Sequence, residues 1–354
     1  MIRANDFRRQ WEDLRADAMA AFEKVGAGGW YVLGEEVRAF ESELAAYWGF
    51  PHAAGVASGL DAIEISLRAL GCGPGDRVLT TPISAFATTL AMVKIGAVPV
   101  FVDTDDTGLI DLEQCHQLLT KRPDIRFFVP VHLYGFLLDS DTLGRVREEH
   151  ELMIVEDCAQ TIRAAGNLAA TSFYPTKNLG AMGDGGAILC QDEALDARVR
   201  ALRDYGQTSK YRHDFIGSNS RLDELQAAYL RRACLPRLER WNARRREIAG
   251  QYLEGIRNPA VRLPVPPKGS DPSWHLFPVW IDPQRRDSFL QQVPAGIHYP
   301  VAIPDQKAMS DVPFEIPDGC ENARRLCASE ASLPIHPYLH DAEVAEIIAA
   351  VNSF

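Results

Sequence analysis

The sequence contains no apolar run of about 18 residues, the length that a membrane-spanning helix needs. Its N-terminal stretch, MIRANDFRRQWEDLRADAMAAF, is polar and charged throughout, so it lacks the apolar segment of a secretory signal. We therefore expect a cytoplasmic protein that does not bind membranes.

Cysteine pairs are missing as well. The seven cysteines are scattered and odd in number, and none forms a CxxC pair. This pattern argues against a disulfide framework and against a zinc site, so we expect no metal. It predicts reduced cysteines that are mostly buried.

Positive charge is in short supply. The chain has 37 lysines and arginines against 48 aspartates and glutamates, a formal net charge of −11. Bulk nucleic-acid binding needs a basic face that neutralises phosphates, so we expect no nucleic-acid partner. A small anionic ligand stays open, because a few local cations or backbone N–H groups can hold one. A GxGxxG motif after a strand is also absent, which argues against a dinucleotide-binding fold of the usual type.

What the chain does contain is typical of a globular protein: 354 residues, 46% of them hydrophobic and 24% charged. Strand-like segments such as 52–57, 77–81 and 98–102 alternate with helical ones through the first two-thirds. The alternation predicts an α/β fold whose mostly parallel sheet carries helices on both faces. We then expect one long helical stretch from Ser220 to about Ile256 and, further on, two strands, LFPVWI and GIHYP.

The length suggests roughly two domains. A Pro-rich segment, NPAVRLPVPPKGSDPSW, follows the long helical stretch and is typical of a linker or loop. We place the domain boundary near residue 250, which divides the chain into a large domain of residues 1–250 and a small C-terminal domain of residues 251–354.

Three segments that follow strands carry candidate chemistry, because ligands of open α/β sheets bind at the carboxyl ends of the strands. Ser58 and Gly59 open a helix whose free N–H groups could hold a phosphate, although Ser58 could equally be a plain helix cap. Asp157 ends the strand LMIVED and could face a cation, or form a strand-end cap or a surface ion pair. Lys177 lies between an aromatic strand, SFYPTK, and a glycine-rich turn. Burial there would lower its pKa and make it a nucleophile, whereas a single lysine is usually solvated.

The order of these segments says more than any one of them. A phosphate cradle, a strand-end acid and, about twenty residues later, a lysine are the groups that pyridoxal 5′-phosphate (PLP) requires. The helix end would take its phosphate, the acid its pyridinium nitrogen and the amine its aldehyde. The sequence therefore predicts PLP as the cofactor.

These segments resemble the DegT/DnrJ/StrS family of PLP-dependent sugar aminotransferases. The similarity extends from GWYVLGEEVRAFE to LPIHPYL, and its most specific pieces are PVFVD, PVHLYG, EDCAQ, SFYPTKNLGAMGDGGA, RDYGQ and IGSNSRLDELQAA. The resemblance implies an aspartate-aminotransferase-like (type I) PLP fold, with a large domain and a small α/β C-terminal domain. It also implies a homodimer whose active sites are shared across the interface.

The resemblance assigns the cofactor contacts. Lys177 matches the lysine that binds the cofactor's aldehyde, and Asp157 matches the acid beside the pyridine nitrogen. Phe86 matches the aromatic residue that stacks on the ring, and Gln160 the residue near its phenolic oxygen. The remaining cofactor-binding positions surround the phosphate, and Asn219 among them would serve the neighbouring subunit: Ser58, Gly59, Leu60, Ser172 and Asn219.

The family implies transfer of an amino group from an amino acid, with L-glutamate as the expected donor, to a nucleotide-linked keto-deoxysugar. Family members with leucine at the position of Leu60 include some that aminate carbon 3 of a dTDP-keto sugar, so we favour a dTDP-3-keto-6-deoxyhexose. A dTDP-4-keto sugar, a cyclitol ketone and a non-catalytic PLP-binding regulator are the alternatives.

Substrate contacts are predicted by segment at His213, His298 and Tyr299, although both histidines could equally be ordinary loop residues. The sequence departs from the family around the acceptor. Ile162 replaces a histidine, Pro304 replaces the histidine of HYPxPxHxQ, and the segment before Ser172 lacks a hairpin. These departures concern the acceptor pocket more than the cofactor site.

Overall fold

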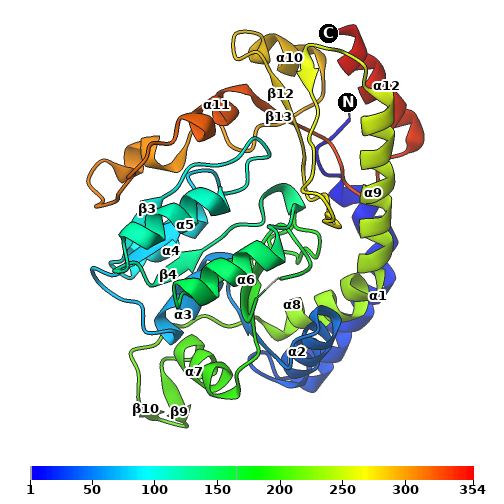
Figure 1. Ribbon diagram of the computed structural model, residues 1–354. Helices are drawn as coiled ribbons and strands as arrows, with labels where there is room; N and C mark the ends of the chain where they lie inside the picture. The colour runs from blue at the N-terminus through cyan, green and yellow to red at the C-terminus, as the bar shows by residue number, and fades with distance from the viewer. Residues whose placement is uncertain (1, 165) are drawn as a thin grey trace.

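A mostly parallel sheet lies at the centre of the computed structural model, which describes residues 2–164 and 166–354 (Figure 1). Two four-stranded sheets, in the orders β3-β2-β4-β5 and β1-β8-β7-β6, continue into one another. They are joined where Val155 donates to Phe128 O at 3.0 Å and Asp157 donates to Pro130 O at 2.9 Å. Only β8 runs antiparallel to its neighbours, so the predicted sheet is confirmed. The strands are β1 (His52–Val56), β2 (Arg77–Thr80), β3 (Val98–Phe101), β4 (Phe127–Val129), β5 (Met153–Ile154), β6 (Glu156–Asp157), β7 (Leu168–Ser172) and β8 (Gly186–Cys190).

Helices cover both faces of this sheet, as predicted. Successive side chains of a strand point to opposite faces. Phe127 and Val129 of β4 accordingly pack into one core cluster with α3, α4 and α7, whereas Phe128 packs into another with α5 and α6. Aspartate or serine side chains cap the first turns of most of these helices. Their bounds are α3 (Gly59–Ala69), α4 (Phe86–Lys94), α5 (Leu112–Lys121), α6 (Ser140–Glu149) and α7 (Glu193–Arg203).

The long helical stretch predicted from Ser220 to Ile256 is interrupted. It consists of α8 (Glu224–Tyr229), a π-helical turn at Leu230–Cys234, a 3₁₀ turn at Leu235–Arg237 and α9 (Leu238–Gly255). Pro236 lies at the break, since proline has no N–H to donate into the preceding turn. Two N-terminal helices, α1 (Phe7–Gly28) and α2 (Glu35–Trp48), pack beside α8.

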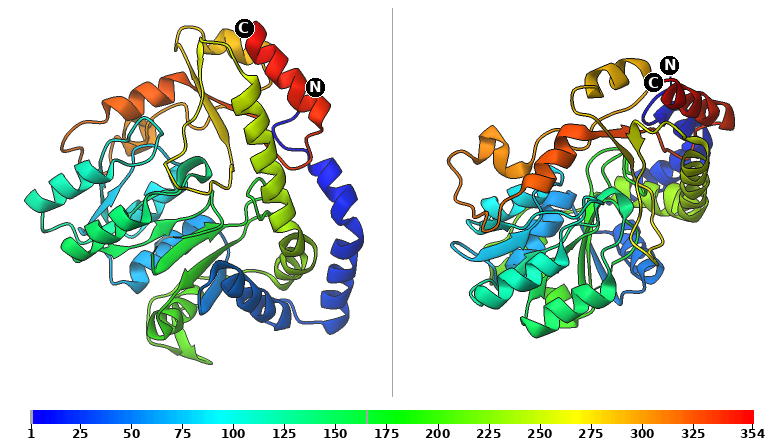
Figure 2. Two further views of the ribbon diagram at one scale, coloured as in Figure 1. Left: turned by 45° about the vertical axis from the view of Figure 1, so that its right-hand side comes forward. Right: turned by 45° about the horizontal axis from the view of Figure 1, so that its top comes forward.

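The C-terminal region adds a small antiparallel sheet of β11 (Val261–Arg262), β12 (Phe277–Ile281) and β13 (Glu330–Leu333), with α10 (Arg286–Gln292), α11 (Glu321–Ser329) and α12 (Asp341–Ser353). The boundary predicted near residue 250 falls inside α9, which runs along both parts (Figure 1). The N-terminus lies beside α12 (Figure 2), where Arg9 and Glu343 form an ion pair at 2.6 Å.

Two predicted strands are wrong. In GIHYP only Gly296 pairs with a strand residue, Ser332, while the His298 N–H donates to the Glu330 carboxylate instead of a strand. The SFYPTK strand stops at Ser172, and a turn closed by Lys177 N and Tyr174 O at 2.8 Å follows. Pro300 and Pro175, which have no N–H for a ladder, lie in these segments.

Two expectations from composition can be compared with the structure directly. All seven cysteines are free and buried, as predicted. Within the described residues, no helix combines the length and apolar character that crossing a bilayer requires.

Candidate active site

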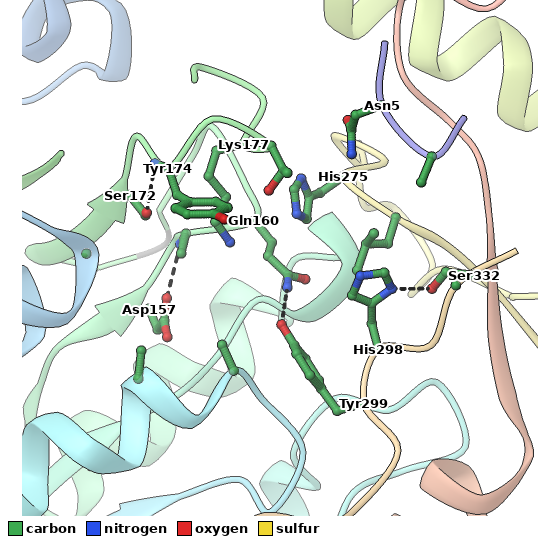
Figure 3. Close-up of a pocket in the computed structure, with 18 of the residues that line it drawn as sticks. Asn5, Asp157, Gln160, Ser172, Tyr174, Lys177, His275, His298, Tyr299 and Ser332 are labelled. Carbon is green, nitrogen blue, oxygen red and sulfur yellow. Dashed lines mark hydrogen bonds between the residues drawn. The ribbon is translucent and has the colours of Figure 1, made fainter. Parts of the chain in front are cut away.

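A cavity of about 550 Å³ opens at the carboxyl ends of the central strands, between the sheet and the C-terminal region. Figure 3 shows side chains from both parts facing it. Nine of the predicted site residues line it together: Ser58, Gly59, Leu60, Asp157, Gln160, Ser172, Lys177, His298 and Tyr299.

One end of the cavity is shaped for a phosphate. Ser58 caps α3 by accepting from Asp61 N at 3.1 Å, so the first N–H groups of the helix stay available. A Cβ on Gly59 would lie 2.6 Å from Ser172 Cβ, and one on Gly186 would lie 2.5 Å from Ser58 O. The absence of side chains at these glycines lets β7 and β8 approach the end of α3 closely, which places the Ser172 hydroxyl beside that helix end. The residues present therefore fit the phosphate group of PLP.

A fixed carboxylate lies further along the same side. Asp157 ends β6 and is 5% exposed. Its Oδ2 accepts from the Thr88 hydroxyl at 2.7 Å, and its Oδ1 accepts from Ala159 N at 3.1 Å. Ser84 in turn lies 2.8 Å from the Thr88 hydroxyl. These bonds hold the carboxylate in one orientation and suit it to a cationic ring nitrogen.

Lys177 supplies the amine. Burial lowers the pKa of Lys177 to about 8, against a smaller opposing effect of the nearby Asp157 charge. Its loop needs Gly180, because a Cβ there would come too close to Pro175 O. A lysine with this pKa is partly neutral near neutral pH, which is the form that attacks an aldehyde.

Gln160 links the cofactor side of the cavity to the C-terminal region. Its Oε1 accepts from Tyr134 N at 2.5 Å, and its Nε2 donates to the Tyr299 hydroxyl at 3.2 Å (Figure 3). The Tyr134 hydroxyl donates to His298 O at 3.1 Å. Gln160 and Tyr299, predicted for cofactor and substrate respectively, therefore lie in one network.

The opposite side of the cavity contains residues that sequence reasoning missed. His275 Nδ1 is 3.0 Å from Asn178 Oδ1, and burial and Lys177 lower the pKa of His275 well below its usual value. Arg245, His336 and the N-terminal Asn5 also line this side. No motif marks these residues, because a helix, two loops and the N-terminus bring them together only in the folded chain.

The other predicted residues lie outside the cavity lining. Phe86 is half-buried and packs against the core, while its neighbours Ala85 and Ala87 face the cavity. Asn219 pairs with Asp204 in an isolated β-bridge.

His213 is exposed on the hairpin of β9 (Gln207–Ser209) and β10 (Arg212–His213), and its Nδ1 lies 2.9 Å from Tyr205 O. The roles of Phe86, Asn219 and His213 stay predictions.

The His298 side chain is held by the C-terminal sheet. Its Nδ1 is 3.0 Å from the Ser332 hydroxyl, which donates to Glu330 Oε1 at 2.5 Å. Burial and the nearby Lys177 lower the pKa of His298, and burial raises the pKa of Glu330 to about 8. His298 therefore presents a neutral imidazole to the cavity.

Comparison with known proteins agrees with this arrangement. The model of the DegT/DnrJ/EryC1/StrS aminotransferase family matches residues 12–352. The dTDP-3-amino-3,4,6-trideoxy-alpha-D-glucose transaminase of Streptomyces venezuelae is 41% identical, with 99% of this chain and 95% of that protein covered. The erythromycin biosynthesis sensory transduction protein EryC1 of Saccharopolyspora erythraea is 40% identical, with 98% of each covered.

The fold is confirmed in the same way. The crystal structure of S. venezuelae DesV in complex with a ketimine intermediate has a TM-score of 0.93 and 40% identity to this chain, covering 98% of this chain and 96% of that one. Fold, cavity and sequence thus agree, and the chain belongs to the DegT/DnrJ/EryC1/StrS family as a PLP-dependent aminotransferase.

Proposed function

We propose that this enzyme transfers an amino group from L-glutamate to carbon 3 of a dTDP-linked 3-keto-6-deoxyhexose in the cytoplasm. The observation that carries the proposal is the enclosure of Lys177, Asp157 and the Gly59 cradle in one cavity. The acceptor is favoured by Leu60, which lies in that cavity, and by the S. venezuelae relative, whose name specifies a 3-amino sugar.

Some residues of the cavity bind the cofactor, and Lys177 transfers the proton. When bound, PLP supplies an electron-withdrawing ring and an aldehyde that carries nitrogen between substrates. The α3 N-terminus and Ser172 bind its phosphate. Asp157, oriented by Thr88, keeps the ring nitrogen protonated. Lys177 takes and returns a proton at Nζ, for which its lowered pKa of about 8 is suited.

The acceptor would extend toward the C-terminal region. His298 and Tyr299 face the cavity from the side opposite Ser172 (Figure 3). Because the pKa of His298 is lowered and its Nδ1–H donates to the Ser332 hydroxyl, the neutral ring leaves Nε2 to accept from a sugar hydroxyl. These residues would hold the keto sugar against the ring, and His213 would reach the substrate of a neighbouring subunit.

We further propose a homodimer with shared active sites. The segment before Asn219 presents Tyr211 and Ile216, which are 83% and 88% exposed, and Trp30 is 66% exposed. Large apolar side chains so exposed are typical of an interface. A second copy of this chain would cover them, and Asn219 would reach the partner's phosphate site.

An acceptor panel tests the substrate. The purified enzyme with PLP and L-glutamate is mixed with a dTDP-3-keto sugar, its 4-keto isomer or a keto-inositol, and 2-oxoglutarate is measured. We expect 2-oxoglutarate chiefly with the 3-keto sugar. Preference for either other ketone contradicts the proposed acceptor, and PLP binding without transfer from any amino acid favours a regulator. Sedimentation of the holoenzyme as a monomer would contradict the shared sites.

A further inference from the structure

Arg245 is a buried cation for which the described chain provides no counter-ion. It is 4% exposed, and its Nη1 donates to Trp274 O and His275 O at 3.2 Å and to Ile335 O at 2.9 Å. Its Nε has no partner. The other deeply buried arginine, Arg203, is paired with the Glu41 carboxylate. The chain thus neutralises one buried arginine and leaves the other with carbonyls alone.

This arrangement is costly unless something else supplies the negative charge. An uncompensated buried charge destabilises the folded state, whereas a paired one is tolerated. Burial lowers the pKa of Arg245 to about 10, so the guanidinium stays cationic at neutral pH. A ligand that brings an anion would complete the site.

Arg245 faces the cavity, where it has few charged neighbours. Among the described residues that line the cavity, the arginines and lysines are Arg245 and Lys177. The nearby His275 and His336 have lowered pKa values, about 4 for His336, so they are neutral at neutral pH. Asp157 and Asp184 are the acidic residues of that lining, and Asp157 is assigned to the ring nitrogen. Arg245 is therefore the lasting positive charge on the substrate side.

We propose that Arg245, with Asn5 and His336 beside it, binds the α-carboxylate of the amino-acid donor. A planar guanidinium matches a carboxylate through two parallel hydrogen bonds. His336 Nδ1, which also lacks a partner, lies in the same lining, and because the ring is neutral and its other nitrogen bonds the Arg3 backbone, Nδ1 can accept from the amino group of the donor. The inference rests on the proposed aminotransferase reaction and names the group that recognises its donor.

The position favours the donor over the diphosphate of a nucleotide sugar. Arg245 and Lys177 line both the main cavity and a recess of about 20 Å³ that also includes Asp6, Thr176 and His336. The Asp6 carboxylate caps α1 by accepting from Arg8 N and Arg9 N, and it forms no ion pair with Arg245. In an α-amino acid, a single carbon joins the carboxylate to the nitrogen that must approach Lys177. In a nucleotide sugar, ring atoms separate the diphosphate from the keto carbon. The short donor therefore fits a cation beside the lysine.

Separate measurement of the two half-reactions tests the assignment. Single-turnover kinetics with L-glutamate give the donor dissociation constant, and the amino-loaded enzyme with keto sugar gives the acceptor constant. In Arg245→Met we expect the donor constant to rise about 30-fold or more, from the loss of charge-assisted bonds, with the acceptor constant changing less than about threefold.

Arg245→Lys is the second variant, because it keeps the charge and a donor to the carbonyls if Arg245→Met does not fold. We expect an intermediate loss of donor affinity of about tenfold, since lysine lacks the planar fork. Arg246→Met is the matched control, because Arg246 pairs with Glu239 on the surface and should leave both constants unchanged. Unchanged donor affinity in Arg245→Lys, or equal losses for donor and acceptor, would overturn the proposal.

Equilibrium binding of 2-methylglutamate separates this proposal from the function. This probe keeps the α-carboxylate but has no α-proton, so it binds without transamination. Binding to the wild-type holoenzyme that is weakened in the Arg245 variants supports the subsite even if no keto sugar is aminated, and that result would contradict the proposed reaction alone. Equal binding to wild type and variants contradicts the subsite.

Discussion

The two sides of the cavity are built differently. On the cofactor side, Asp157 ends a strand of the central sheet and Gly59 and Lys177 come shortly after one, so backbone geometry positions them. On the substrate side, Arg245 and His298 come from α9 and from a C-terminal loop, and side-chain contacts hold them. The cofactor side can be recognised from short sequence segments, because each segment carries its own site residue. The substrate side forms only when segments that are distant in the sequence pack together in the folded chain. Variants on the two sides should therefore fail in different ways.

The largest effect is expected for Lys177→Ala. Loss of the amine that both binds the cofactor and moves the proton should lower turnover by about four orders of magnitude. Stopped-flow assay of both half-reactions measures it, with Lys121→Ala on the exposed face of α5 as the control. Turnover within tenfold of wild type would contradict the role given to this lysine.

Asp157→Asn should come next. The substitution keeps the size of the side chain but removes the negative charge that stabilises the protonated ring nitrogen. We therefore expect turnover to fall about 10²- to 10³-fold. Thr88→Val, which removes only the 2.7 Å bond to Asp157, should cost about tenfold. Equal activity of Asp157→Asn and wild type, with a normal cofactor spectrum, would exclude this function of the acid.

The phosphate cradle is tested by Gly59→Ala. The new Cβ would lie 2.6 Å from Ser172 Cβ, so we expect PLP affinity to fall about tenfold or more. Gly28→Ala is the control, since a Cβ there meets nothing within 4 Å. Fluorescence titration with PLP measures the dissociation constants. An unchanged dissociation constant in Gly59→Ala would contradict the role of Gly59 in phosphate binding.

The smallest effect on chemistry is expected on the substrate side, at Glu330. Burial raises its pKa from 4.5 to about 8, so the folded state binds a proton that the unfolded state has lost in this range. Its contribution to stability is complete below pH 4.5 and is lost as the pH rises through about 8.

Compared with Glu330→Gln, the wild-type free energy of unfolding should therefore fall, by about 5 kcal/mol, across that window. Denaturant unfolding at a series of pH values measures this difference, with exposed Glu346→Gln as the control. PLP affinity should stay unchanged. A parallel pH dependence in wild type and Glu330→Gln would show that Glu330 is ionised in the fold.

The sequence predicted the cofactor side of the cavity and the sheet behind it, because strand periodicity places Asp157 and the Gly59 turn at one edge. It did not predict Arg245 or His275, whose approach depends on packing of α9 against loops far away in the chain. The mistaken strand at GIHYP has the same origin, because the side chain of the distant, buried Glu330 accepts the hydrogen bond from the backbone N–H of His298.

The central claim, that Lys177 is the amine that carries the cofactor, can be tested by chemical trapping. The enzyme loaded with PLP is reduced with borohydride, digested and mapped by mass spectrometry. We predict a pyridoxyl phosphate adduct on the peptide that contains Lys177, and its absence in Lys177→Ala. An adduct on another lysine, or none in an enzyme that binds PLP, would contradict it.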